Sequence, residues 1–309
     1  MQVVAPLQNA LAKIGTHRIW ARLAFVIFIV LICLAIGFGT MARERTFSLV
    51  ATTLGGEITF NGQQNDWQFS EVIRCTMRTS PDFRISGEAR EELCDNALFK
   101  VEHLSDIVVS WRDAERIQFR SHPSGGLQIR LDSDSRADMP PGSLLIIPQA
   151  AWADHGALAF QGAVQLGGEM ATGSTDYLLS GHWEALQTGL ATSLVRDITE
   201  VVKSGTLVRG STVDFIKSEG NVISFGHLTP RDESTTGIEV ALLTERAPIA
   251  LRVSYYGLQE PAIFKPDWID TISSSTLLVA LAALLSLIAG IVGLVLAVPG
   301  QQEQDSDSE

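Results

Sequence analysis

The chain has 309 residues and a net charge of −12, and much of its apolar content lies in two uncharged tracts near the ends. An acidic chain is a poor nucleic-acid binder, because a nucleic-acid interface needs a basic surface. The sequence also lacks a Walker loop, a Gly-x-Ser-x-Gly elbow and a His-Glu-x-x-His pair, so it carries none of these common catalytic signatures.

The two apolar tracts predict transmembrane helices. Residues 276–298 hold no charge, and a helix of that length crosses a hydrocarbon core of roughly 30 Å with all its backbone groups satisfied. With an interfacial flank, this second span covers residues 271–299. The first span covers residues 23–42. Both ends of the intervening segment are therefore expected to be anchored in membrane lipid.

The charges that flank the first span predict its orientation. Lys13, Arg18 and Arg22 are the only charges in the leader, residues 1–22, so the positive-inside rule places the N-terminus in the cytoplasm. Residues 43–270 then lie outside the cytoplasm, and the acidic tail, residues 300–309, returns to it. The expected location is a bacterial-type inner membrane. A cleaved signal peptide ending near residues 40–42 is the alternative, and it exports the same domain.

Between the spans the apolar pattern changes to period two, interrupted by Gly, Asn, Asp and Pro, which is typical of short antiparallel strands. The fold class we predict is mainly β, an antiparallel sandwich or jelly-roll-like domain; a solenoid suggested by the similar glycine spacing of 156–164 and 205–213 ranks below it. Asn61-Gly62 predicts a hairpin turn. The expected strands are 47–53, 57–60, 99–104, 107–111, 117–120, 127–131, 143–147, 157–160, 163–166, 177–184, 205–209, 213–216, 222–228, 238–243 and 249–256.

Two stretches depart from this pattern. Residues 86–98 are expected to form a short helix that begins at Ser86. Residues 190–202 have apolar residues at helical spacing but are rich in β-branched side chains, so a pair of strands is slightly favoured over a helix.

Cys75 and Cys94 are the only cysteines of the predicted exported domain. In an oxidising compartment such a pair is typical of a disulfide, with a free thiol or a metal ligand as the alternatives. Cys33 lies within the first span, where it is interpreted as a small apolar packing residue.

No catalytic residue, metal ligand or cofactor is assigned. The exported domain holds five histidines, and Asp154-His155 and His182-Trp183-Glu184 are the two suggestive motifs among them. Scattered histidines in a β-domain are more often hydrogen-bonded surface residues than metal ligands.

Small residues recur every four positions along the second span and predict a face on which another helix can pack closely. They are Ala282, Ser286, Gly290 and, on an adjoining strip, Ala289, Gly293 and Ala297. The expected partners are the first span, a second copy of the chain, or another integral-membrane or periplasmic protein.

The cytoplasmic segments are too short for a signalling module, and neither span holds the ionisable residues of a transport pathway. We therefore expect a non-enzymatic scaffold or accessory subunit that presents its exported domain to a protein partner or an envelope polymer. The two-span layout resembles that of the polysaccharide co-polymerases, although the long helices of their exported domains are missing here. The alternative is an inner-membrane-tethered periplasmic hydrolase, which requires histidine and aspartate side chains to meet in a pocket.

Overall fold

The structure is a computed structural model. It describes residues 44–62, 65–80, 94–95, 97–122, 125–132, 139–168, 175–188, 199–231 and 236–267, and isolated positions in the two terminal tracts.

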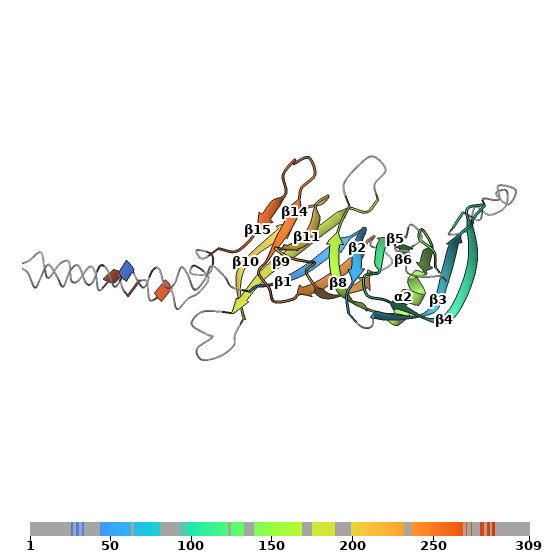
Figure 1. Cartoon of the computed structure of the whole chain (residues 1–309), viewed down its shortest axis with the longest axis horizontal. Helices are drawn as coiled ribbons and strands as arrows, with labels where there is room; N and C mark the ends of the chain where they lie inside the picture. Colours follow the sequence, from blue (N-terminus) through green and yellow to red (C-terminus); the bar gives the residue numbers. More distant parts are fainter. Residues whose placement is uncertain are drawn as a thin grey trace, which may run out of the picture.

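The described residues form fifteen strands and one short helix (Figure 1). The strands are β1 (Thr46–Thr53), β2 (Gly55–Phe60), β3 (Asn65–Met77), β4 (Phe99–Trp111), β5 (Arg116–Ser121), β6 (Leu127–Leu131), β7 (Leu144–Ile147), β8 (Leu158–Leu166), β9 (Leu178–Thr188), β10 (Thr199–Leu207), β11 (Thr212–Lys217), β12 (Ser224–Pro230), β13 (Ile238–Thr244), β14 (Ile249–Ser254) and β15 (Ala262–Phe264). The helix is α2 (Gln149–His155). The prediction of a mainly β domain is confirmed, whereas the sandwich or jelly roll stays a prediction.

All fifteen strands belong to one sheet, and all their pairings are antiparallel. The main path is β10-β9-β1-β13-β12-β8-β2-β5-β6-β7-β3-β4, and β11, β14 and β15 branch from β8. The branch arises because one edge of β8 pairs first with β12, through Leu158–Gly162, and then with β11, through Gln165 and Leu166.

The two branches bury aromatic side chains against each other. Phe47 on β1 lies 5.9 Å from Phe215 on β11, and Trp183 on β9 lies 5.0 Å from Phe264 on β15, measured between ring centroids. Alternation along β1 explains the position of Phe47, since every second residue of this strand is buried. The main apolar core therefore extends between the branches.

In the other half of the domain the sheet curls until β3 returns to β8. Phe60 and Trp111 stack at 5.3 Å, and the Trp67 ring meets both edge-on, at 5.8 and 5.4 Å. Trp67 Nε1 donates a hydrogen bond to the carbonyl of Ala159 on β8 (2.6 Å). Side-chain contacts thus join β3 to β8, although no ladder pairs these two strands in the described chain.

Several sequence predictions of local structure are wrong. Asn61-Gly62 does not close a hairpin, because β2 pairs with β5 and β8, while β3 pairs with β4 and β7. Gly62 does adopt a positive φ of 96°, so the turn residue was recognised but its partner strand was not. β3, β15 and α2 were missed.

Two predicted interruptions are also absent. The strands expected at 99–104 and 107–111 form the single strand β4, with Asp106 at a positive φ of 52° between them. Those expected at 157–160 and 163–166 form β8. The solenoid alternative fails because the ladders are antiparallel. Of residues 190–202, the last four belong to β10 as favoured, and the rest lie outside the described residues, as does most of 86–98.

The backbone of β2 lies close to Gly162 on β8. A Cβ built there would lie 2.2 Å from the Thr59 carbonyl oxygen and 2.9 Å from the Phe60 Cα, both backbone atoms that have little room to move. We expect Gly162→Ala to lower the free energy of unfolding by about 1–3 kcal/mol or more through overpacking. Denaturant-induced unfolding measures this. Gly168→Ala is the control, because its nearest neighbours lie at 3.6–3.8 Å; an equal loss in both variants would contradict the steric explanation.

The two ends of the domain meet. Arg45, just before β1, is buried and exchanges backbone hydrogen bonds with Ala247. Burial lowers its pKa, and the carboxylates of Asp267 and Asp270 act in the opposite direction. Asp270 in turn accepts a hydrogen bond from Lys203 (2.9 Å). The entry and exit of the domain therefore share one cluster of charges.

The predicted spans, 23–42 and 271–299, are described only at isolated positions, all of them helical. No helix among the described residues has the length and apolar character needed to cross a bilayer. In Figure 1 the described positions of both tracts lie at the same end of the molecule, and the β3–β4 arm lies at the opposite end.

Candidate functional site

A row of polar side chains crosses the outer face of the sheet. Residues directly opposite each other on neighbouring strands point to the same face, so the register defines which side chains lie side by side. The polar row, as we name it, follows six adjacent strands and comprises Arg130 on β6, Gln118 on β5, Glu57 on β2, Gln165 on β8, Asp214 on β11 and Arg252 on β14. With strands about 4.8 Å apart, it spans up to roughly 24 Å.

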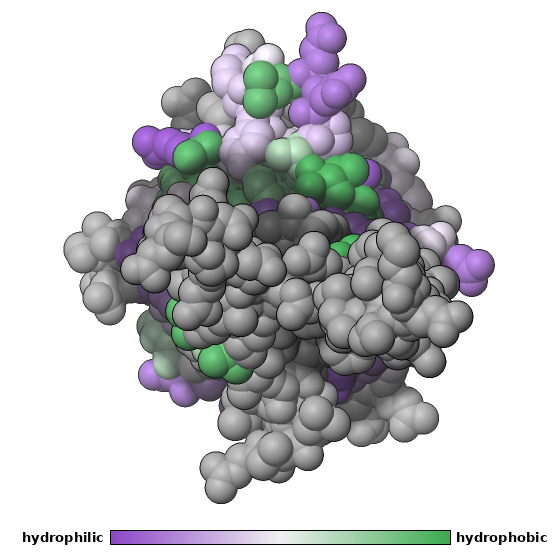
Figure 2. All heavy atoms as spheres, turned by 90° about the vertical axis from the view of Figure 1, so that its left-hand side faces the viewer, coloured by the Kyte–Doolittle hydropathy of each residue, from purple (hydrophilic) through white to green (hydrophobic). Residues whose placement is uncertain are grey.

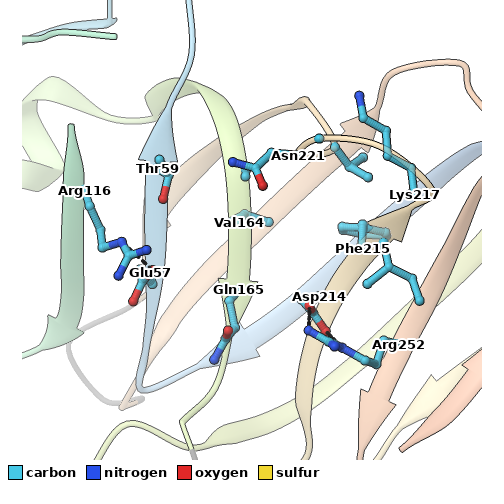
Figure 3. Close-up of a pocket in the computed structure, with 14 residues that line it drawn as sticks. Glu57, Thr59, Arg116, Val164, Gln165, Asp214, Phe215, Lys217, Asn221 and Arg252 are labelled. Atoms are coloured by element: carbon cyan, nitrogen blue, oxygen red, sulfur yellow. Dashed lines mark hydrogen bonds and ion pairs between the residues drawn. The ribbon is translucent and has the colours of Figure 1, made fainter. Parts of the chain in front are cut away.

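Three clefts lie along this row, with volumes of about 290, 240 and 630 Å³. Gln165 lines all three, and Figure 3 shows its side chain between Glu57 and Asp214. The clefts are therefore neighbouring parts of one surface.

Two ion pairs hold the row in place. Arg252 donates from Nε to Asp214 Oδ1 (2.8 Å), and its Nη2 donates to Oδ2, which makes the pair bidentate. Arg116 Nε lies 3.1 Å from Glu57 Oε1. The hydrogen bonds that Arg252 donates to Asp214 raise the pKa of Arg252, and its side chain stays 44% exposed, so a fixed cation faces solvent here.

A third pair borders the first cleft. Lys217 Nζ donates to Glu245 Oε1 (2.8 Å). Burial alone would raise the pKa of Glu245, but the hydrogen bonds from Lys217 and from the Ile223 backbone N–H lower it below its ordinary value. The contact with Lys217 thus favours the charged form of Glu245.

Aromatic side chains border the largest cleft, at the β14 end of the row. Tyr255 and Tyr256 both line it, and Tyr256 is 70% exposed. Figure 2 shows the turn between β14 and β15 projecting above the domain, with hydrophobic and near-neutral residues beside hydrophilic ones. An exposed tyrosine next to fixed hydrogen-bonding groups can stack on a ring and orient it.

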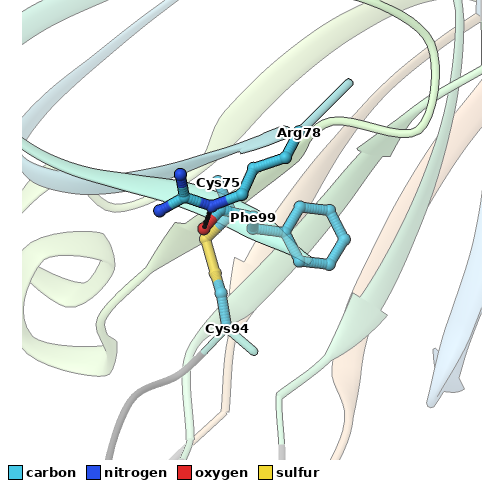
Figure 4. The surroundings of a disulfide bond; sticks show 4 residues. All are labelled: Cys75, Arg78, Cys94 and Phe99. Atoms are coloured by element: carbon cyan, nitrogen blue, oxygen red, sulfur yellow. Dashed lines mark hydrogen bonds between the residues drawn. A yellow bond between two sulfur atoms is a disulfide. The ribbon is translucent and has the colours of Figure 1, made fainter. Parts of the chain in front are cut away.

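The predicted disulfide is present, and it joins Cys75 and Cys94 with their Cα atoms 6.4 Å apart (Figure 4). Both cysteines belong to a second, small apolar cluster with Ile73 and Ile146. Along β7, Leu145 and Ile147 join the main core while Ile146 joins this cluster, so the disulfide lies on the opposite face of the sheet. Beside it, Arg78 Nε donates to the Phe99 carbonyl (3.1 Å).

On the β3–β4 arm, Glu102 lies between two bases. Hydrogen bonds from Lys100 and then Arg74 lower its pKa to about 2. Because the folded-state pKa lies below the unfolded value near 4.5, this carboxylate contributes stability above about pH 4.5 and loses it as the pH falls toward 2. We expect the NMR titration midpoint of Glu102 to lie near pH 2 and to rise in Lys100→Met; a midpoint that stays at pH 4.5 in both proteins would contradict the contact.

The histidine motifs do not converge. On β9, His182 Nε2 lies 3.4 Å from Glu184 Oε1. His155 is the last residue of α2, and its ring centroid lies 5.7 Å from that of Phe69. The described residues contain no group of three or more His, Cys, Asp or Glu side chains that could hold a metal ion. Of the predicted packing residues of the second span, only Ser286 is described; Ala282, Ala289, Gly290, Gly293 and Ala297 lie outside the described residues.

Sequence reasoning missed the polar row. Its members alternate with buried residues and were identifiable as outward-facing, but their neighbours depend on a strand order that brings β2 next to β8 and β11 next to β14. No family model, curated protein or solved structure matches the chain.

Proposed function

We propose that this chain is a non-enzymatic, membrane-anchored accessory protein whose exported β-domain binds an extended polar polymer of the cell envelope along the polar row. The observation that carries the proposal is the alignment of six hydrogen-bonding side chains across six strands, with three clefts that share Gln165. A linear, ring-containing polymer such as a glycan offers hydroxyl groups to such a row and a ring face to Tyr256.

Two features support export and anchoring. A disulfide persists in an oxidising compartment, which agrees with a domain outside the cytoplasm. The ends of the domain meet at Arg45 and Asp270, which agrees with a chain that two spans tether to one membrane. The spans themselves, residues 23–42 and 271–299, remain part of the proposal, with both termini in the cytoplasm. We also propose that the domain is a β-sandwich, because its two branches pack against each other through Phe47 and Phe215.

Binding is favoured over hydrolysis by the contacts of the two carboxylates in the row. Glu57 and Asp214 each form an ion pair with an arginine side chain, whereas a glycosidase needs two carboxyl groups free to reach the bond that is cleaved.

The test is affinity measured with the full chain in nanodiscs of zwitterionic lipid, against neutral and uronate oligosaccharides. We expect Gln165→Ala to weaken binding roughly 2- to 10-fold, the effect of one or two lost hydrogen bonds. Gln161→Ala is the matched control, because it is the same residue type on the same face of β8, four residues away and outside all three clefts. The proposal would be refuted if neither the neutral nor the uronate oligosaccharides bind, or if both variants weaken binding equally.

A further inference from the structure

The cleft of about 240 Å³ lies at the β5–β6 end of the polar row. Arg120 and Gln118 on β5 and Arg130 on β6 line it from one side, and Gly167, Gly168 and Asp176 from the other.

Arg120 and Arg130 point to the same face of the sheet. Gln118 lies directly opposite Arg130, and Arg120 is two residues further along the same strand, so the two arginines are diagonal neighbours. Such neighbours lie roughly 7–8 Å apart at their backbones, within reach of one shared anionic group for two long side chains.

The clefts are basic although the chain is acidic. Their lining holds five bases and three acids, a local net charge of +2 against −12 for the whole chain. The bases are Arg116, Arg120, Arg130, Lys217 and Arg252, and the acids are Glu57, Asp176 and Asp214. A concave surface of opposite sign to its surroundings attracts an anion selectively.

The surplus positive charge is concentrated at one end. Arg116, Lys217 and Arg252 each pair with a carboxylate. In the part of the chain that the structure describes, neither Arg120 nor Arg130 forms an ion pair. The row is therefore polarised, with two arginines that form no ion pair among the described residues, against the single carboxylate of Asp176, at the β5–β6 end and tyrosines at the β14 end.

We infer that the polymer is acidic, and that Arg120 and Arg130 receive one of its carboxylate or phosphate groups while Tyr256 stacks on a ring toward the other end. This inference rests on the proposed function and adds the charge of the ligand and its direction along the row. A guanidinium pair binds either kind of anion through charge-assisted hydrogen bonds.

The test uses the full chain in zwitterionic nanodiscs with three probes: an oligouronate, the same oligouronate with its carboxyl groups methyl-esterified, and a glycerol phosphate oligomer. The ester differs from the acid in charge, so their ratio of Kd values measures the contribution of the anion. We expect the acid to bind at least about tenfold more tightly than the ester, and Arg120→Gln/Arg130→Gln to abolish most of this preference. The phosphate oligomer shows which anion is preferred.

Arg246→Gln/Lys265→Gln is the control, since it changes the net charge equally at two exposed positions outside the clefts. It should keep the preference for the acid. Equal affinity for acid and ester would overturn the inference and leave the proposed function standing. Equal loss in both double variants would also overturn it, and failure of all three probes to bind would overturn the proposed function as well.

Discussion

Trp67→Ala is expected to lower the free energy of unfolding by about 3–5 kcal/mol, the range for removing a fully buried tryptophan. Its ring packs edge-on against both Phe60 and Trp111, and its Nε1 donates to the carbonyl of Ala159. No backbone ladder joins β3 to β8 in the described chain, so this side chain is a main connection between them. Chemical denaturation monitored by circular dichroism measures the loss.

Trp67→Phe is the control for that experiment. It keeps an aromatic ring in the core and removes the hydrogen bond to Ala159, so we expect a smaller loss, with about 1 kcal/mol from the hydrogen bond. A loss below 1 kcal/mol in Trp67→Ala would contradict the position of this residue at the centre of the core.

The second large effect concerns the disulfide. The bond closes a loop between residues 19 positions apart, and its removal is expected to cost about 3 kcal/mol of stability. Cys75→Ala/Cys94→Ala should therefore unfold at a lower denaturant concentration than the natural protein. Because the bond belongs to a small cluster away from the main core, the remaining domain should still fold.

Reducing agent supplies the check on this prediction. It should lower the stability of the natural protein to that of the double variant and leave the variant unchanged. Cys33→Ser keeps the pair and should match the natural protein, since Cys33 is a free cysteine outside the domain. A natural protein that is indifferent to reductant would show that the bond does not stabilise the fold.

Local pattern predicted the strands well where one face is buried. β6, for example, alternates buried and outward residues along Leu127–Leu131 and was expected at those bounds. Pattern failed at β3, whose alternation was not recognised, and at strands that are interrupted without ending. β3 was missed although Trp67 and Phe69 alternate with polar residues, and Gly162 was mistaken for a strand end because a glycine at a close approach resembles one at a turn.

The site was harder to predict than the strands. The Cys75–Cys94 pair follows from the count of cysteines and the compartment, and it needs no knowledge of strand order. The polar row brings Glu57 beside Gln165, more than one hundred residues away, through contacts that no local pattern encodes. Local sequence pattern predicts which residues of a strand face outward, but it does not predict which distant strand lies beside it.

Radical footprinting of the full chain in zwitterionic nanodiscs tests the central claim, that the ligand lies along the polar row. Tyr256 and Phe225 are both exposed aromatic residues, but only Tyr256 lines a cleft of the row, whereas Phe225 belongs to β12. With a saturating oligosaccharide, oxidation of Tyr256 should fall severalfold while that of Phe225 stays unchanged. Protection of Phe225 with continued oxidation of Tyr256 would place the ligand away from the polar row and contradict the account.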